Sequence, residues 1–292
     1  MLGAEFYNTL ARLRLSMGHK SSMNMSGNRK SVQKGSSAEF SDFREYMPGD
    51  DVRQIDWNAY GRLDRLFVKE YMEEKEAVVS LLIDTSASME YGKQKKSDLA
   101  VQIAAALAYL ALAGMDRVVV YDMQRMQSPF MAYGGKKGYP RLLKWLEQLS
   151  FTGEADMQAA VRQMAVKGPG MTILISDFLS EQMVNGPEDE IVKLMKYLDY
   201  RKQRAVMLHV MAEEELQVEL SGTYNLIDME NEQQLKVTME QTSIREYQEA
   251  LKNFLDKLQR SCKKAGSNYI LCKTSRNLYQ LIFEDLRELY DI

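Results

Sequence analysis

Three oxygen-bearing side chains follow a short apolar segment of the chain. Residues 78–83 (VVSLLI) have the composition of a buried β-strand, and Asp84, Ser86 and Ser88 come directly after them. This spacing places one carboxylate and two hydroxyls in a single loop. Such oxygen ligands suit Mg²⁺ or Mn²⁺ better than Zn²⁺. The sequence therefore predicts a divalent-cation site in this loop.

A second apolar segment ends in the same way. Residues 171–176 (MTILIS) are followed by Asp177, and the carboxyl ends of parallel strands meet at one edge of an α/β sheet. We therefore expect Asp84 and Asp177 to converge, with water or a partner's carboxylate completing an octahedron around the cation. Ser and Asp after a strand also commonly cap the next helix, but the next helical pattern begins only near Ser97. The set of four oxygen ligands favours a cation site over capping.

Strands and helices alternate from residue 77 onward. This alternation predicts an α/β fold with a mostly parallel sheet and helices on both faces. The expected strands are 78–83, 117–121, 128–133, 171–176, 205–211 and 268–272; the expected helices are 97–113, 139–149, 156–166, 188–200, 242–264 and 276–290, with a hairpin insertion over 216–239. We divide the chain into an accessory N-terminal segment, 1–76, and an α/β domain, 77–292.

The N-terminal segment has three parts with different compositions. Apolar residues at helical spacing predict a helix over 4–17, and a strand or extended segment is expected over 62–71. Between them, residues 19–37 are rich in Ser, Gly, Asn, Lys and Arg, which is typical of a loop or arm. Residues 1–37 hold six basic residues and one acidic residue. An arm that binds anions and a solvated tail both fit this charge, and the lack of aromatic residues in 19–37 favours the tail.

Residues 39–57 combine acids, arginines and aromatic residues at an unusual density for a linker. Pro48-Gly49-Asp50 indicates a turn. The acidic side chains have two interpretations. They form a partner-binding or second ion site, or they have structural roles in which Asp50 and Asp51 stabilise the turn while Asp56 pairs with Arg53 or Arg62. The structural interpretation is favoured. Arg and Trp are common anchors of protein interfaces, so an interaction surface is also predicted, with these candidate residues: Arg44, Asp50, Asp51, Arg53, Asp56 and Trp57.

Composition limits the classes of function. The chain has 292 residues, a net charge of −3 and two cysteines, which argues against general nucleic-acid binding and a disulfide framework. The longest apolar stretch, 99–114, is shorter than a membrane span needs and contains Gln102. No secretory signal pattern is present at the N-terminus. These features predict a cytoplasmic protein.

Two motifs resemble a known family. Asp84-Thr85-Ser86-Ala87-Ser88 is similar to the DxSxS motif of von Willebrand factor A domains, in which it forms a metal-ion-dependent adhesion site. Glu39-Phe40, Arg44-Glu45-Tyr46, Pro48 to Arg53 and Ile55-Asp56-Trp57 resemble the signature of the bacterial domain-of-unknown-function family 58. The genes of that family usually lie beside those of MoxR-type AAA+ ATPases. The resemblance implies a von Willebrand A-like (Rossmann-like) fold, a metal site at Asp84, Ser86, Ser88 and Asp177, and a MoxR-type ATPase or its client as partner.

One position departs from the metal-site pattern. Von Willebrand A domains typically place a threonine in a Gly-Gly-Thr-Asp-Leu loop, whereas this chain has Gly153-Glu154-Ala155-Asp156-Met157. Ala155 offers no side-chain oxygen. Asp156, Glu154 and Thr152 are the alternatives for the missing ligand, and their spacing does not choose among them.

Both an interaction protein and an enzyme fit an aspartate at a strand end. Metal-dependent nucleases of the PIN type begin from such an aspartate but need three or four carboxylates around two metal ions. Neutral hydroxyls at Ser86 and Ser88 favour a docking ion, and no general base accompanies them. We therefore expect a non-enzymatic adaptor that uses Mg²⁺ or Mn²⁺ to hold an acidic residue of its partner, with the PIN-type nuclease as the alternative.

Overall fold

A computed structural model describes residues 4–10, 12–16, 38–73, 77–165, 168–217, 222–227, 234–239 and 241–291. These residues form two compact units. Residues 38–73 make up the smaller unit, and all other described residues belong to the larger one. The predicted basic arm, 19–37, lies outside the described residues.

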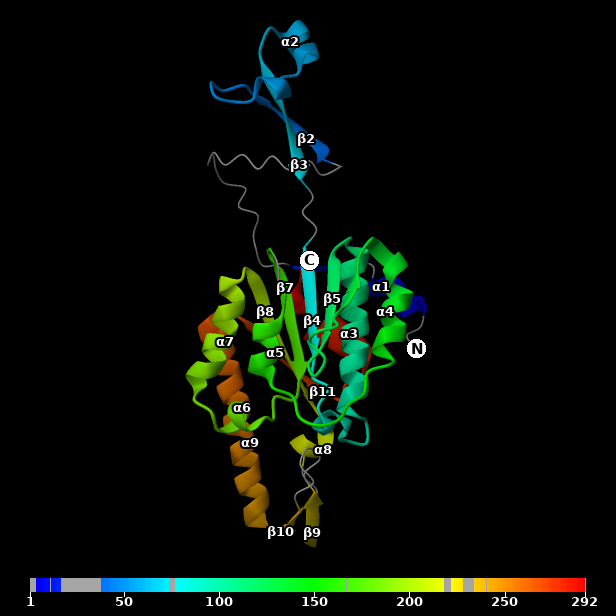
Figure 1. The fold of residues 1–292 in the computed structure, drawn as a ribbon, viewed down its shortest axis with the longest axis vertical. Coiled ribbons are helices and arrows are strands. Elements are labelled where there is room, and N and C mark those ends of the chain that lie inside the picture. The colour runs from blue at the N-terminus through cyan, green and yellow to red at the C-terminus, as the bar shows by residue number, and fades with distance from the viewer. Residues whose placement is uncertain are drawn as a thin grey trace. The chain divides into compact units, whose positions relative to one another are not determined.

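A six-stranded sheet forms the centre of the larger unit (Figure 1). Its strands, in spatial order, are β11 (Asn268–Lys273), β8 (Gln203–Met211), β7 (Gly170–Ser176), β4 (Val78–Ile83), β5 (Arg117–Asp122) and β6 (Phe130–Ala132). All neighbouring strands are parallel except the pair β5–β6 at one edge. When these six strands are numbered 1 to 6 in the order in which they occur in the chain, their spatial order from β6 to β11 is 3-2-1-4-5-6. This is the order of doubly wound folds. The predicted α/β fold class is confirmed.

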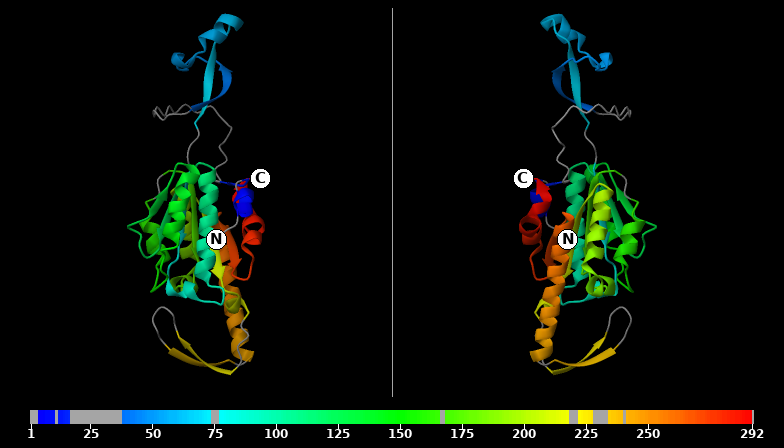
Figure 2. Two further views of the ribbon diagram at one scale, coloured as in Figure 1. Left: turned by 90° about the vertical axis from the view of Figure 1, so that its right-hand side faces the viewer. Right: turned by 90° about the vertical axis from the view of Figure 1, so that its left-hand side faces the viewer.

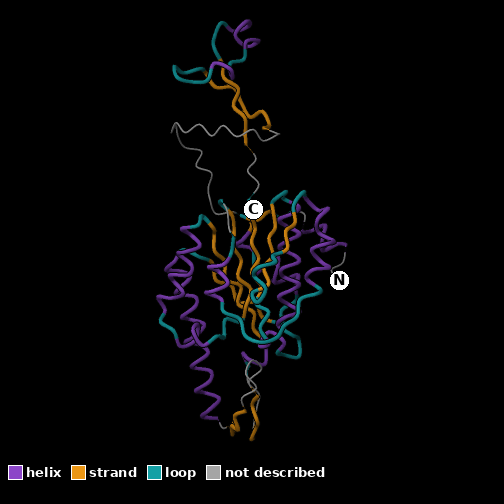
Figure 3. The backbone as a smooth tube through the Cα atoms, viewed as in Figure 1, coloured by secondary structure: helices purple, strands orange, loops and turns teal. Residues whose placement is uncertain are grey.

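Alternate residues of each strand pack against helices on opposite faces of the sheet. Leu81 and Ile83 of β4 face one apolar core, and Leu82 between them faces the other. The first core includes α3 (Lys96–Ala113), α4 (Tyr139–Leu146) and α1 (Ala4–Leu10); the second includes α5 (Met157–Gln163), α6 (Glu181–Asn185), α7 (Glu188–Tyr200) and α9 (Gln241–Ala265). The three layers are visible in Figures 2 and 3. Such continuous apolar strands are expected where helices cover both faces of a sheet.

Helix α3 is the most apolar of the described helices. By length and composition it alone among them would suffice to cross a membrane, but 72% of it is buried inside the unit. Its Ala and Leu residues pack on the sheet. Burial on nearly all sides is typical of the central helix of an α/β domain.

The first and last segments of the chain differ from the prediction. The helix expected over 4–17 ends at Leu10, because β1 (Arg14–Leu15) pairs with β12 (Tyr290–Asp291). Helix α1 packs on the α/β domain, with the rings of Tyr7 and Tyr109 4.8 Å apart. It therefore belongs to the larger unit and not to the N-terminal segment in which the division at residue 76 placed it.

The final helix is also shorter than predicted. The range 276–290 contains α10 (Leu278–Gln280), a π-helical turn (Leu281–Asp285) and a 3-10 turn (Arg287–Leu289). Leu281, Leu286 and Leu289 are fully buried. Their spacing of five and three residues does not fit one straight α-helix, and the π turn brings all three toward the core.

An insertion extends from the carboxyl end of the sheet. Helix α8 (Glu213–Leu216) leads into the predicted hairpin, formed by β9 (Gly222–Ile227) and β10 (Gln234–Met239). The hairpin lies at the same end of the unit as α8 and the beginning of α9 (Figures 1 and 2). The insertion thus adds surface next to the strand ends that carry Asp84 and Asp177.

The smaller unit consists of an antiparallel strand pair and a short helix. Strand β2 (Ala38–Glu45) pairs with β3 (Phe67–Glu73), and α2 (Trp57–Leu63) lies between them in sequence. The strand predicted over 62–71 begins only at Phe67, because α2 extends to Leu63 and the chain then turns at Asp64, which has a left-handed backbone conformation. Ile55 and Val68 are buried and form an isolated bridge. This small core leaves most of the apolar side chains of α2 exposed.

Candidate functional site

The two predicted aspartates lie at the point where the strand order reverses. Strands β4 and β7 are direct neighbours in the sheet, and the chain leaves them toward opposite faces. The backbone N–H of Asp84 donates to the Ile175 carbonyl at 2.9 Å. Ligands of doubly wound folds bind at this switch point, outside the carboxyl ends of the strands. The topology therefore brings Asp84 and Asp177 together, as the sequence predicts.

Asp84 is a buried carboxylate held in a fixed orientation. Its Oδ1 accepts the backbone N–H of Ser86 at 2.9 Å, and its Oδ2 accepts the hydroxyl of Ser176 at 2.5 Å. Burial raises the pKa of Asp84, and the negative charge of Asp177 raises it further, against these hydrogen bonds. A carboxylate in this environment is stabilised by a nearby cation.

The two serines of the loop present their hydroxyls side by side. Ser86 Oγ and Ser88 Oγ are 3.1 Å apart. Neighbouring oxygens around Mg²⁺ lie about 3.0 Å apart, since six ligands at about 2.1 Å form an octahedron. The hydroxyl spacing therefore matches one edge of such an octahedron.

Asp177 is engaged by a buried lysine that the sequence analysis does not single out. Lys96 begins α3, and its Nζ donates to Asp177 Oδ2 at 2.7 Å and to Glu215 Oε1 at 2.6 Å. Glu215 of α8 also accepts the backbone N–H of Ala212, and its carbonyl accepts the hydroxyl of Tyr247 in α9. One ammonium thus connects the strand end to the base of the insertion.

The charges at this edge of the sheet do not cancel. Burial lowers the pKa of Lys96, but the carboxylates of Asp177 and Glu215 outweigh it and raise the pKa overall, so the lysine stays charged. With Asp84, three carboxylates and one ammonium carry a formal charge of −2. A divalent cation would balance this charge.

A small pocket opens between these side chains. It is lined by Asp84, Ser86, Ala155 and Asp177 together with Met123, Met157, Ser176, Phe178, Ser180 and Met183. Its volume of about 10 Å³ is close to that of one water-sized sphere. The pocket therefore has room for one ion or one water molecule, and Ala155 contributes no oxygen to it.

Asp156 does not replace the missing threonine in this arrangement. Its carboxylate is used to cap α5, where it accepts the backbone N–H of Ala159 at 3.0 Å. Ser88 does not line the pocket, but its hydroxyl is 3.1 Å from that of Ser86, which does. Asp84, Ser86, Ser88 and Asp177 fit a hard divalent cation in ligand type and charge, with fewer protein oxygens than the resemblance implies.

Sequence reasoning missed three charged residues at this edge. Lys96 donates to both Asp177 and Glu215, and Asp122 accepts the hydroxyl of Thr85 at 2.6 Å. Asp122 carried a usable signal, because it ends an apolar strand in the same way as Asp84 and Asp177 do. Lys96 also carried a signal, because it is a lysine at the first position of a largely apolar helix.

In the smaller unit, the predicted acidic residues have structural roles. Asp50 pairs with Arg44 at 3.0 Å and accepts the backbone N–H of Met47. Asp51 and Asp56 accept backbone N–H groups at the starts of the 3-10 turn Val52–Gln54 and of α2. For Asp50 and Asp51, the favoured structural interpretation agrees with this geometry, whereas the role observed for Asp56 is to cap α2. Arg53 and Trp57 remain exposed.

The comparison with protein families identifies the chain. A family model described as "Protein of unknown function DUF58" matches residues 42–254, which include the signature segment from Asp42 onward and both strand-end aspartates. The chain belongs to this family. The DUF58 resemblance predicted from the sequence is confirmed, and the larger unit has the doubly wound α/β fold that this resemblance implies.

Two curated relatives match part of the DUF58 chain. They are uncharacterized protein Rv1480 of Mycobacterium tuberculosis and uncharacterized protein Mb1516 of Mycobacterium bovis, each 29% identical over 180 residues. The match covers 58% of this chain and 56% of each relative, so the chain spans about half the length of these proteins.

Solved structures with a similar fold include two proteins of different origin. The conserved hypothetical protein BatB from Bacteroides thetaiotaomicron is 12% identical, with a TM-score of 0.42 over 73% of this chain and 98% of that one. The SpRpn10 VWA domain is 14% identical, with a TM-score of 0.37 over 72% and 94% of the two chains.

Proposed function

We propose that this DUF58 protein is a non-enzymatic interaction adaptor whose docking site is the carboxyl edge of the central sheet. The partner is a MoxR-type AAA+ ATPase or the client of that ATPase, and the adaptor serves in assembly or maturation of a client complex. The convergence of Asp84 and Asp177 at the switch point, beside the paired hydroxyls of Ser86 and Ser88, is the observation that carries this proposal.

The four side chains act together to receive an acidic residue of the partner. Mg²⁺ or Mn²⁺ held there supplies a positive charge with open coordination positions, which a carboxylate can fill. Ser86 and Ser88 contribute neutral oxygens, so they do not cancel that charge. Asp84 is oriented by Ser176, and Asp177 by Lys96. This arrangement suits reversible docking.

The PIN-type nuclease has less support from the geometry. Among the described residues, no group of three or more acidic, histidine or cysteine side chains converges in a way that could hold a metal ion. The third nearby carboxylate, Asp122, accepts the hydroxyl of Thr85 and the backbone N–H of Gln124. Two-metal hydrolysis needs more carboxylate ligands than Asp84 and Asp177 supply.

A binding experiment with a MoxR-type ATPase encoded beside the protein's gene tests the proposal. We expect binding in the presence of Mg²⁺ and loss of binding in EDTA. Asp84→Ala and Ser86→Ala should bind weakly in Mg²⁺. Ser80→Ala is the matched control. Ser80 is a buried serine of β4, the strand that precedes Asp84 and Ser86; it lies outside the pocket, and its Oγ has no hydrogen-bond partner. Equal binding by all four proteins, with and without EDTA, would sink the proposal.

A further inference from the structure

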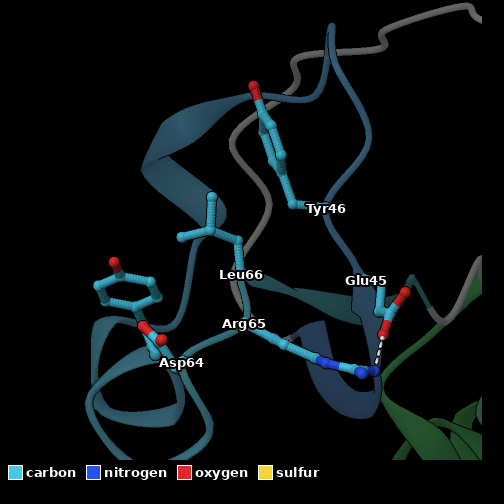
Figure 4. A pocket seen from close by; sticks show the side chains of 6 residues that line it. Glu45, Tyr46, Asp64, Arg65 and Leu66 are labelled. Atoms are coloured by element: carbon cyan, nitrogen blue, oxygen red, sulfur yellow. Dashed lines mark hydrogen bonds and ion pairs between the residues drawn. The ribbon is translucent and has the colours of Figure 1, made fainter.

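The smaller unit contains an open pocket that is separate from the strand-end site. Glu45, Tyr46, Tyr60, Asp64, Arg65 and Leu66 line it, and its volume is about 590 Å³ (Figure 4). Pockets that hold ligand or peptide groups in proteins are usually about 300–1,000 Å³. This one is therefore large enough for a long side chain together with its neighbours.

Charges in the pocket are distributed unevenly. Arg65 pairs with Glu45 at 3.0 Å and extends toward it, away from Asp64 (Figure 4). No described residue forms an ion pair with Asp64. The pocket therefore offers a carboxylate without an ionic partner among the described residues, one helical turn after Tyr60. Tyr46 lies on the other side of Leu66 and points away from Asp64 (Figure 4).

The backbone of Asp64 adopts a left-handed conformation that is more favourable for glycine than for aspartate. It follows the last residue of α2 with φ of 52° and ψ of 31°, in the left-handed region. Glycine is the usual residue at this position of a helix end, and an L-residue there costs free energy. Asparagine also adopts this conformation readily, so Asp64→Asn removes the charge and leaves the backbone as it is.

Exposed apolar side chains surround the pocket. Trp57 and Leu63 of α2 are 63% and 61% exposed. The ring of Trp57 meets that of Tyr60 edge to face, with centroids 6.3 Å apart, so the apolar surface continues from the pocket wall. A partner segment that enters the pocket would bury these side chains.

We propose that this pocket binds an arginine side chain presented by an apolar segment of a partner protein. A guanidinium is planar, stacks on aromatic rings and pairs with a carboxylate through two hydrogen bonds. Tyr60 supplies the ring, and Asp64, one helical turn later, supplies the carboxylate. Apolar residues on either side of the arginine cover Trp57 and Leu63. This site is independent of the strand-end site and takes a partner group of opposite charge.

Titration of the isotope-labelled full chain, followed by NMR, tests the arginine site. The probes are N-acetyl-arginine methylamide and its citrulline analogue, which has nearly the same shape and no charge. We expect the arginine probe to shift the amide signals of Tyr60, Asp64 and Leu66 with a dissociation constant on the order of 1 mM. The citrulline probe should bind about tenfold more weakly, as should the lysine analogue, which cannot stack in the same way.

Two variants separate the pocket from general charge attraction. Asp64→Asn should weaken arginine binding about tenfold, whereas Asp51→Asn, at an exposed acid of the same unit outside the pocket, should leave it unchanged. Equal binding of the arginine and citrulline probes, or unchanged binding by Asp64→Asn, overturns the proposal. So do signal shifts that occur elsewhere in the chain.

A pair of tripeptides tests the apolar part. Acetyl-Leu-Arg-Leu-amide should bind more tightly than acetyl-Gly-Arg-Gly-amide, and Trp57→Ala should reduce this difference because it removes an exposed ring from the surface. If the two tripeptides bind the wild-type protein equally, the partner segment is not apolar and this part of the proposal is wrong.

Discussion

At the scale of single residues, the strand-end site depends on a buried lysine. Lys96 contacts two carboxylates, Asp177 and Glu215, and all three are largely withdrawn from water. Buried charged side chains are tolerated only when they are paired with side chains of opposite charge, since an isolated buried charge is costly. Lys96 is therefore needed to hold the Asp177 side chain in place beside the pocket.

Replacement of Lys96 should destabilise the protein strongly. Lys96→Met leaves the carboxylates of Asp177 and Glu215 without their shared cation, and removal of one partner from a buried ion pair costs about 3–5 kcal/mol. Urea denaturation measures this loss. Lys95→Met is the control, because Lys95 is half exposed in its pair with Glu90 and such pairs contribute less than about 1 kcal/mol. Similar losses in both variants would contradict the assigned role of Lys96.

His209 should make stability depend on pH. Burial lowers the pKa of this side chain to about 4 from its ordinary value of 6.5. The unfolded chain therefore binds a proton at a pH where the folded chain does not. Protonation of His209 therefore does not reduce the free energy of unfolding above pH 6.5, but it lowers this free energy by about 3 kcal/mol as the pH falls from 6.5 toward 4.

Denaturation at a series of pH values checks this dependence. His209→Gln cannot take up the proton and should show a smaller fall between pH 6.5 and 4. The comparison uses the slope with pH, because the substitution itself also changes packing around Phe178 and Phe254. An identical slope in both proteins would show that His209 is not the responsible group.

The placement of the two aspartates could be predicted from the sequence, because a pattern gave both the residue type and its position at the end of a strand. Asp84 and Asp177 each follow an apolar strand, and the rule for parallel sheets placed them together. Lys96 and Glu215 could not be found in this way, because they are 119 positions apart and no local pattern connects them. Asp156 was a reasonable substitute ligand by spacing, but its capping of α5 uses the same carboxylate.

At the scale of elements, strands were predicted better than chain ends. Strands such as β4 and β7 are buried on both faces, so their apolar composition is continuous and easily recognised. The predicted helices at 4–17 and 276–290 failed because Arg14–Leu15 and Tyr290–Asp291 pair with each other across almost the whole sequence. Local periodicity contains no information about such a distant partner.

The close approach of β4 and β7 gives a prediction for Gly170. A Cβ at this position would overlap the carbonyl oxygen of Val78, so Gly170→Ala must push the two strands apart at their beginning. We expect a loss of about 1–3 kcal/mol in the free energy of unfolding. Gly61→Ala is the control, because its Cβ meets nothing within 4 Å and alanine favours the helix. Equal stability of the Gly170 variant and the wild type would contradict this packing.

At the scale of the whole molecule, the chain offers two surfaces of different chemistry. The α/β unit presents a strand-end pocket with a formal excess of negative charge and room for one cation. The smaller unit presents an aromatic pocket that contains the carboxylate of Asp64. An adaptor that binds an acidic group through a cation and an arginine through Asp64 would recognise two features of its partners. The net charge of −3 gives no sign of either site, because both depend on local placement.

A crystal structure of the protein grown with Mn²⁺ tests the central claim most directly. The account predicts an anomalous scattering peak in the pocket beside Asp84, with Ser86 Oγ and Ser88 Oγ about 2.1–2.2 Å from the ion. Asp177 should remain paired with Lys96 while it faces the ion. Full side-chain order at Asp84, Ser86 and Ser88 with no anomalous peak between them would contradict a cation-assisted docking site.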